Sequence, residues 1–398
     1  MKIYLLGNIA NVQTGPFGSQ LHKEDYVEFG TPMVTVEHLG NRAFTKQNLP
    51  MISDSDKKRL NKYVLNEGDI VFSRVGSVDR CSYVDNKHLG WMFSGRCLRI
   101  RPCNVVYPLY LYYYFCMENT KQFIRNIAVG ATMPSINTKL MKDLEVPLPT
   151  KEIQQKIASI LSALDDKIEL NNKINENLEQ QAQAIFKSWF VDFEPFGGVI
   201  PEDWNKCTLD SICSLISKGV TPKYIDCSEQ IVINQKCIRN HKIDLTFARY
   251  HIPKKINEKW LKHGDILINS TGTGTLGRAA QVLFAPKNLT VDSHVTIVRA
   301  KKTNYQYYLG VWAISHECTF EKMQTGSTSQ TDLPRELLKQ MEILLPSDEI
   351  LNNYSSIIKP IFDMMVANQQ EINRLAELRD TLLPKLMNGE IDVSKVKI

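Results

Sequence analysis

The 398-residue sequence predicts an α+β fold: two similar globular modules in tandem repeat, joined by two long antiparallel coiled-coil-like helices. Three observations predict this class. Short motifs recur in the same order about 196 residues apart, which indicates two modules of one architecture. Within each copy, short apolar runs are bounded by Gly and Pro, as is typical of strands. A long stretch with apolar residues at helical spacing follows each copy.

The repeated motifs define the modules. They are Gly-Asp-Ile-Val at 68–71 and Gly-Asp-Ile-Leu at 264–267, Gly76 and Gly272, Gly-Ala-Thr at 130–132 and Gly-Ser-Thr at 326–328, and the segments 145–149 and 342–346 that end in Leu-Pro. We therefore predict a first module at 1–149, a central helical spacer at 150–194, a second module at 195–346, a distal helical spacer at 347–388 and a tail at 389–398. Because most residues between the motifs differ, the two modules should present different surfaces.

Each module should be built from strands and one aromatic-rich helix. The predicted strands are 31–36, 69–73 and 97–101 in the first module, and 231–233, 265–268 and 294–298 in the second. The predicted helices are 107–125 and 305–323. Their aromatic side chains are expected to pack a core rather than to stack on bases.

The two spacers carry apolar stripes, from Ile153 to Trp189 and from Ile350 to Leu386. Asn171 and Asn368 interrupt these stripes near their middles, and we expect them to fix the register of the helices. Pro360 should kink its helix or delay its start. The arms most simply pack against each other, and antiparallel pairing would put the modules at opposite ends of a rod of roughly 60 Å. A helical spacer or dimerisation arm with no measuring role is the alternative.

Charge separates modules from helices. Residues 1–150 hold 18 Lys and Arg against 13 Asp and Glu, and residues 200–346 hold 19 against 14, whereas both spacers are acidic. A polyanion should therefore be held by the modules. Nine cysteines without a Cys-x-x-Cys pair indicate reduced thiols rather than disulfides or zinc. No apolar run approaches the roughly 18 residues of a membrane span, so we expect a soluble cytoplasmic protein without membrane contact.

Several segments together match a known family. They are Ile-Pro-Glu-Asp-Trp at 200–204 with Leu-Asp-Ser-Ile at 209–212, Gly-Ser-Thr-Ser-Gln at 326–330, Val-Pro-Leu-Pro at 146–149 with Gln154, Phe-Lys-Ser-Trp-Phe-Val-Asp-Phe at 186–193, and Leu-Pro-Lys-Leu-Met-Asn-Gly-Glu-Ile at 383–391. Over essentially its whole length the chain resembles the specificity subunit of Type I restriction-modification systems.

The resemblance implies that each module is a target-recognition domain reading one half of an asymmetric, split target in double-stranded DNA. It also implies that the helices set the gap and dock two modification subunits. Those partners would carry S-adenosylmethionine and methylate adenine, and restriction subunits would use ATP and Mg for translocation and cleavage. The chain itself would be a non-catalytic recognition subunit without a cofactor or metal.

Two segments resemble parts of enzyme sites, but we expect a turn in one and a solvated helix face in the other. Residues 272–277 match the dinucleotide-binding glycine spacing, but the segment 278–286 that follows is too short and strand-like to be the required helix. The aligned segment 76–81 lacks the glycines, so a turn is expected. No methyltransferase signature or phosphate-binding loop is found in the sequence. Asp165 and Asp166 should be a solvated helix face rather than part of a nuclease centre.

DNA contact should come from Lys and Arg on phosphates and from a few polar side chains on bases. The predicted DNA-binding residues are Gln20, Lys23, His38, Arg42, Arg74, Arg80 and Ser135 in the first module, and Lys223, Asn234, Gln235, Arg239, Thr273, Arg278, Ser329 and Gln330 in the second. The predicted contacts with the modification subunits are Phe186, Trp189 and Phe190.

Two other hypotheses stay open at this point. The chain could be a protein-interaction scaffold on a coiled coil, or the recognition half of a restriction enzyme whose catalytic half is a separate chain. A salt titration separates the scaffold from a DNA-binding protein, because DNA binding weakens steeply with ionic strength.

Overall fold

The computed structural model describes residues 1–18, 20–253, 255–326 and 331–396. It divides into two compact units. Unit 1 is Met1–Glu169 with Ile372–Ile398, and unit 2 is Leu170–Glu371. Each unit therefore contains one sequence module together with parts of both long helices, α6 (Lys151–Phe190) and α11 (Asp348–Met387).

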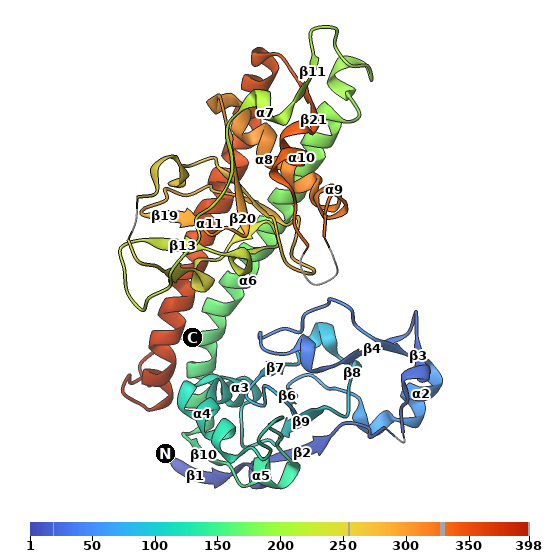
Figure 1. The fold of residues 1–398 in the computed structure, drawn as a ribbon. Helices are drawn as coiled ribbons and strands as arrows, with labels where there is room; N and C mark the ends of the chain where they lie inside the picture. The colour runs from blue at the N-terminus through green and yellow to red at the C-terminus, as the bar shows by residue number, and fades with distance from the viewer. Residues whose placement is uncertain (19, 254, 327–330, 397–398) are drawn as a thin grey trace. The chain divides into compact units, whose positions relative to one another are not determined.

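The first module holds a four-stranded antiparallel sheet in the order β2-β9-β6-β7 (Figure 1). Its strands are β2 (Ala10–Thr14), β9 (Cys97–Pro102), β6 (Ile70–Ser73) and β7 (Cys81–Tyr83). A second sheet has the order β3-β5-β4-β8, with β3 (Tyr26–Val27), β5 (Met51–Ile52), β4 (Thr31–Val34) and β8 (Met92–Phe93). A separate short antiparallel pair, β1 (Lys2–Leu5) with β10 (Glu145–Leu148), completes the strands of the first module. The helices are α1 (Leu6–Ile9), α2 (Asp54–Arg59), α3 (Pro108–Cys116), α4 (Glu118–Ile127) and α5 (Thr138–Lys142).

The second module repeats the same four-stranded topology as β12-β20-β17-β18. These strands are β12 (Cys213–Lys218), β20 (Val295–Ala300), β17 (Ile266–Asn269) and β18 (Ala279–Gln281). Further strands are β11 (Asn205–Thr208) with β21 (Glu342–Leu345), β16 (Arg249–Tyr250) with β13 (Ile231–Ile233) and β19 (Leu289–Val291), and β14 (Ile238–Arg239) with β15 (Lys242–Ile243). The helices are α7 (Leu209–Ile212), α8 (Gln306–Ser315), α9 (Glu317–Lys322) and α10 (Arg335–Gln340). The predicted α+β tandem repeat is confirmed.

Each unit buries its module against the long helices. In unit 1, Phe72 of the sheet and Phe115 of α3 share a core with Leu161 of α6 and Leu386 of α11. In Figure 1, α3 lies beside the strands of this sheet. A separate apolar cluster lies under the second sheet of each module. A module thus cannot bury its own apolar face without α6 and α11.

The two long helices pair in antiparallel fashion within each unit. In unit 2, Asn171 of α6 contacts Glu371 of α11, and Phe190 near the end of α6 contacts Tyr354 near the start of α11. Helix α11 runs continuously through Pro360, so the predicted alternative of a delayed helix start is wrong.

The single aromatic helix predicted for each module is wrong in its length, because both segments break into two helices. Met117 adopts an extended backbone with φ −61° and ψ 136° between α3 and α4. His316 separates α8 from α9, and its ring stacks on Trp312 with centroids 4.4 Å apart. The first helix of each pair is almost entirely buried, whereas Phe123 of α4 is exposed. The break in each helical segment therefore follows from this packing rather than from a Gly or Pro.

Candidate nucleic-acid interface

In each module, the loop after a central strand meets the loop that carries the second repeated glycine motif. In the first module, Val75 and Val129 both form β-bridges with Ser135, and the Gly76 amide donates to the Pro134 carbonyl at 2.8 Å. In the second module, Thr271 and Thr325 both form β-bridges with Asp332. The structure therefore gives both modules the same pair of joined loops.

The repeated glycines are explained by these loops. Gly76 and Gly272 have φ of 73° and 102°, and Gly130 and Gly326 have φ of 114° and 108°. These angles lie in the left-handed region, which residues with a side chain rarely adopt. The prediction that residues 272–277 form a turn is confirmed, since strand β18 follows them instead of a helix.

The joined loops of the first module bring two predicted residues together with two apolar ones. Arg74 donates from Nη1 to the Gly95 carbonyl at 3.1 Å, and its guanidinium lies 5.7 Å from the centre of the Phe17 ring. Ser135 donates to the Val129 carbonyl at 3.1 Å. Phe17 and Met133 are exposed and were missed by the sequence analysis.

The corresponding loops of the second module carry polar groups, both neutral and charged. Thr271 donates to Gln235 Oε1 at 3.2 Å and lies 2.8 Å from His294 Nδ1. Arg278 donates to the Gly274 carbonyl at 2.8 Å, and Thr273 is exposed nearby in sequence. His294 was not predicted, and nothing in its sequence neighbourhood marks it. Ser329 and Gln330 lie outside the described residues.

Among the other predicted DNA-binding residues, Arg80 ends the loop that follows β6, whereas Gln20, Lys23, Lys223, Asn234 and Arg239 lie outside the joined loops. Gln20 accepts a hydrogen bond from the Tyr63 hydroxyl at 2.8 Å, and Lys23 begins a short 3-10 helix, η1 (Lys23–Asp25). Arg80 is exposed and donates to the Leu39 carbonyl. Asn234 accepts from the Lys236 amide at 2.8 Å and donates to the Phe247 carbonyl at 2.6 Å. Lys223 and Arg239 are exposed.

The structure corrects the prediction for His38. Its side chain is buried, with Nδ1 3.0 Å from the Thr35 amide and Nε2 3.0 Å from the Gln47 carbonyl. A ring enclosed between two backbone groups holds its own loop in place and cannot reach a nucleotide.

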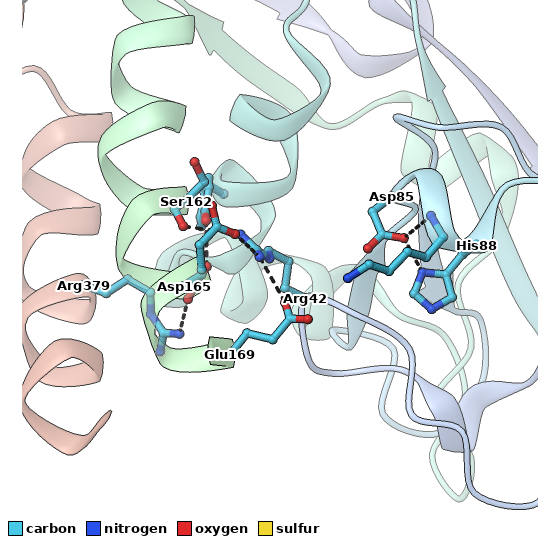
Figure 2. Close-up of polar contacts among 10 residues, drawn as sticks. Arg42, Asp85, His88, Ser162, Asp165, Glu169 and Arg379 are labelled. Carbon is cyan, nitrogen blue, oxygen red and sulfur yellow. Dashed lines mark hydrogen bonds and ion pairs between the residues drawn. The ribbon is translucent and has the colours of Figure 1, made fainter. Parts of the chain in front are cut away.

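Arg42 also has a different role from the predicted one, because it faces helix α6 (Figure 2). Its guanidinium forms ion pairs with Asp166 and, at 3.3 Å, with Glu169, and it lies 3.5 Å from the Ser162 carbonyl. Burial is the largest single influence and would lower the pKa of Arg42, but the hydrogen bond to Asp166 and the nearby charges, those of Asp166 and Asp165 among them, together raise it. Arg42 thus ties the first module to the helix that follows it.

The prediction that Asp165 and Asp166 form a solvated helix face is wrong for Asp165, whereas the Asp166 side chain is 66% exposed. Asp165 is buried and accepts hydrogen bonds from the Tyr113 hydroxyl at 2.6 Å and from Arg379 Nη1 at 2.8 Å. Burial, followed by the charge of Asp165, raises the pKa of Tyr113. Helix periodicity alone could not show that α3 and α11 would both cover this turn of α6. Figure 2 shows Arg42 and Arg379 approaching it.

The second module has a matching contact with α6. His241 forms ion pairs with Glu179 of α6 and, through Nε2 at 3.5 Å, with Glu317 of α9. These hydrogen bonds, to Glu179 and then to Glu317, raise the pKa of His241 to about 10. Arg42 and His241 occupy equivalent positions. Arg42 lies four residues after His38, and His241 lies four residues after Cys237. The carbonyls of His38 and Cys237 each accept a backbone hydrogen bond across their own loop.

The predicted register residues lie in the helix seam of unit 2. Asn171 is buried and donates to Glu371 at 2.8 Å. Asn368 donates to Asn175 Oδ1 at 2.9 Å, and Asn175 in turn donates to the Met365 carbonyl at 3.2 Å. Asn175 was missed, although it lies one helical turn after Asn171.

The aromatic residues predicted to contact the modification subunits instead belong to the core of unit 2. Phe186 and Phe190 are buried, and their rings pack against Tyr308 at 5.7 and 4.8 Å. Trp189 is half-buried, with its ring 5.9 Å from that of Tyr354. Phe186 and Phe190, predicted to contact the modification subunits, thus have their rings buried within this chain. Their apolar side chains already pack against other residues of this chain.

All nine cysteines are free thiols. Within the described ranges, no group of three or more His, Cys, Asp or Glu side chains is placed to hold a metal ion. Among the described helices, none is both long enough and apolar enough to cross a membrane.

Comparisons with known proteins agree on one family. The sequence model of the Type I restriction modification DNA specificity domain matches residues 1–180 and 201–377. The specificity subunit of the Type I restriction enzyme MjaIX of Methanocaldococcus jannaschii is 30% identical over 322 residues, which cover 75% of this chain and 72% of that protein. The specificity subunit of the Type I restriction enzyme HindI of Haemophilus influenzae is 26% identical over 408 residues, which cover 83% and 88%.

The fold has a counterpart among solved structures. The crystal structure of the S subunit of a Type I restriction-modification system from M. genitalium matches with a TM-score of 0.60 at 15% identity. The match covers 97% of this chain and 95% of that one. At this identity the likeness concerns the fold.

Proposed function

The chain belongs to the DNA specificity subunits of Type I restriction-modification systems, and we propose that each of its modules reads one half of an asymmetric, split DNA target. The observation that carries this proposal is the repeated pair of joined loops. The two modules share the backbone arrangement, with β-bridges to Ser135 in one and to Asp332 in the other. The side chains around it differ, from Arg74 and Met133 to Thr271 and Thr273.

Such a pair of loops can combine the two parts of DNA recognition. Cationic and hydroxyl groups contact phosphates and position the protein, while base edges are read by side chains that differ between sites. Two modules with one backbone arrangement and different side chains should therefore read two unrelated half-sites.

We further propose that α6 and α11 set the gap between the half-sites and dock two modification subunits. Arg42 and His241 support this role, since each ties its module to α6 through carboxylates on that helix. In the proposed complex, the modification subunits carry S-adenosylmethionine and methylate adenine. Restriction subunits supply translocation and cleavage with ATP and Mg, and the complex works in the cytoplasm.

The chain itself is proposed to be non-catalytic. The purified chain alone should neither methylate nor cleave DNA, and adding its modification subunits should produce adenine methylation at one split sequence. Methyl transfer by the rigorously purified single chain would refute this part of the proposal.

Exchange of one module tests independent reading. Residues 200–346 are replaced by the corresponding module of another specificity subunit, and methylated sites are mapped across a genome. One half of the target should change while the other half stays the same. A change in both halves contradicts independent reading, and a pure protein scaffold would give no methylated sequence at all.

A further inference from the structure

The second module has an exposed edge that combines aromatic, aliphatic and cationic side chains. We name Lys223, Tyr224, Ile225, Arg249, Tyr250 and Ile252 the aromatic edge. The large apolar members are between 37% and 48% exposed, although such residues are usually buried. Exposed apolar groups that cluster in this way mark binding surfaces.

Backbone pairing joins the two segments of the aromatic edge. Strand β16 pairs with β13 on one side. On its other side, Tyr224 forms a β-bridge with His251, the Ile225 amide donates to the Tyr250 carbonyl at 3.2 Å, and the Ile252 amide donates to the Lys223 carbonyl at 2.9 Å. The side chains of the edge are therefore held on a defined backbone rather than on a free loop.

Positive charge is concentrated in the segment that forms this edge. Residues 221–262 contain nine Lys and Arg against four Asp and Glu, while the remainder of residues 200–346 contains ten of each. The whole positive excess of the second module thus lies in 42 residues. The matching segment of the first module, residues 17–65, holds seven Lys and Arg against six Asp and Glu.

The cations of the aromatic edge are available to a ligand. The guanidinium of Arg249 lies 3.7 Å from the centre of the Tyr224 ring, a cation–π arrangement that orients it without neutralising it. Neither Arg249 nor Lys223 forms a salt bridge with any residue the structure describes. An uncompensated cation on an aromatic platform fits a polyanion with flat, partly apolar groups, which is the chemistry of DNA.

We propose that the aromatic edge is a DNA-contacting surface of the second module, additional to its joined loops. Arg249 and Lys223 contact backbone phosphates, and Tyr224 and Tyr250 pack on sugars or donate their hydroxyls to phosphates. This inference rests on the proposed function. Since the first module has no such concentration of charge, the second module should supply more of the salt-dependent affinity.

The test measures DNA binding by the full chain assembled with its modification subunits, using a duplex with both half-sites and a series of salt concentrations. Arg249→Ala should weaken binding about tenfold and reduce the slope of log affinity against log salt by about one. Tyr224→Ser should weaken binding with the slope unchanged, because it removes no charge. Lys206→Ala, an exposed cation of the same module outside segment 221–262, should change neither quantity.

Thermal unfolding of each variant identifies any that fails to fold. If Tyr224→Ser does not fold, Lys223→Ala replaces it, and this variant should reduce the salt slope as Arg249→Ala does. Unchanged affinity and slope in Arg249→Ala and Lys223→Ala overturn the inference. So does loss of assembly with the modification subunits at unchanged DNA affinity, which would identify a protein-docking surface. Failure of the proposed function is distinct, because the wild-type complex would then recognise no split target.

Discussion

The buried carboxylate of Asp69 accepts two hydrogen bonds of 2.7 Å from the guanidinium of Arg101. The second module repeats this pair with the same two distances between Asp265 and Arg299. In both modules a backbone amide three residues earlier also donates to the Asp at 2.8 Å. The repeated Gly-Asp motif therefore marks a buried ion pair that joins a turn to the four-stranded sheet.

Removal of Arg101 should destabilise unit 1 strongly. Arg101→Ala leaves the buried Asp69 carboxylate without its partner, a change that costs roughly 3 kcal/mol or more. Denaturant unfolding of the full chain measures the effect. Arg101→Lys should lose less, because it keeps the charge and loses only the two-point geometry. A loss below about 1 kcal/mol for Arg101→Ala, the size of an ordinary hydrogen bond, would contradict a structural role for the pair.

The contact of His241 should make unit 2 sensitive to pH. Glu179 and Glu317 raise its pKa from 6.5 to about 10 in the folded chain. Because the folded pKa exceeds the unfolded one, the stabilisation is fully present below pH 6.5 and is lost as the pH rises toward about 10. The difference in unfolding free energy between wild type and His241→Gln should shrink over this range. A difference independent of pH would show that His241 is not held charged by the two carboxylates.

Arg42 should position the first module on α6 rather than contact DNA. Arg42→Glu places a carboxylate beside Asp166 and Glu169, so it should lower the unfolding free energy by about 1 kcal/mol and broaden the range of gaps that is methylated. Arg42→Glu combined with Asp166→Arg restores an ion pair and should narrow the range again. Methylation of a duplex pool with varied gaps provides the readout. An altered half-site sequence at an unchanged gap would instead assign Arg42 to base reading.

Local signals in the sequence were sufficient for three strands of each module, for the repeated turns and for the helix stripes, whereas other strands of the main sheets, such as β2 and β12, were not predicted. Gly76 and Gly272 were recognisable because their backbone angles exclude most other residues. The partner of Asp69 was not, because Arg101 lies 32 residues away and meets it only through the register of β6 and β9. Asn171 was predicted at the seam, yet Asn175 requires knowledge of which α11 residue faces it.

The least predictable feature of the candidate site was the direction of its side chains. Arg42 and His38 are residue types that bind DNA, but one faces a helix and the other is enclosed in its own loop. Residue type and position in a loop do not distinguish these cases. Tertiary packing decides them, and it also placed Phe186 and Phe190 in a core instead of on a surface.

In the proposed complex, α6 and α11 measure the gap between the half-sites. Four residues inserted after Asn172 in α6 and four after Gln370 in α11 lengthen both paired helices by ~6 Å and turn them by about 40° beyond a full turn. Genome-wide mapping of methylated sites then measures the gap. Since one DNA turn of ~34 Å holds about ten base pairs, the preferred gap should grow by one or two base pairs while both half-site sequences stay the same. An unchanged gap in a folded, active variant would contradict the claim.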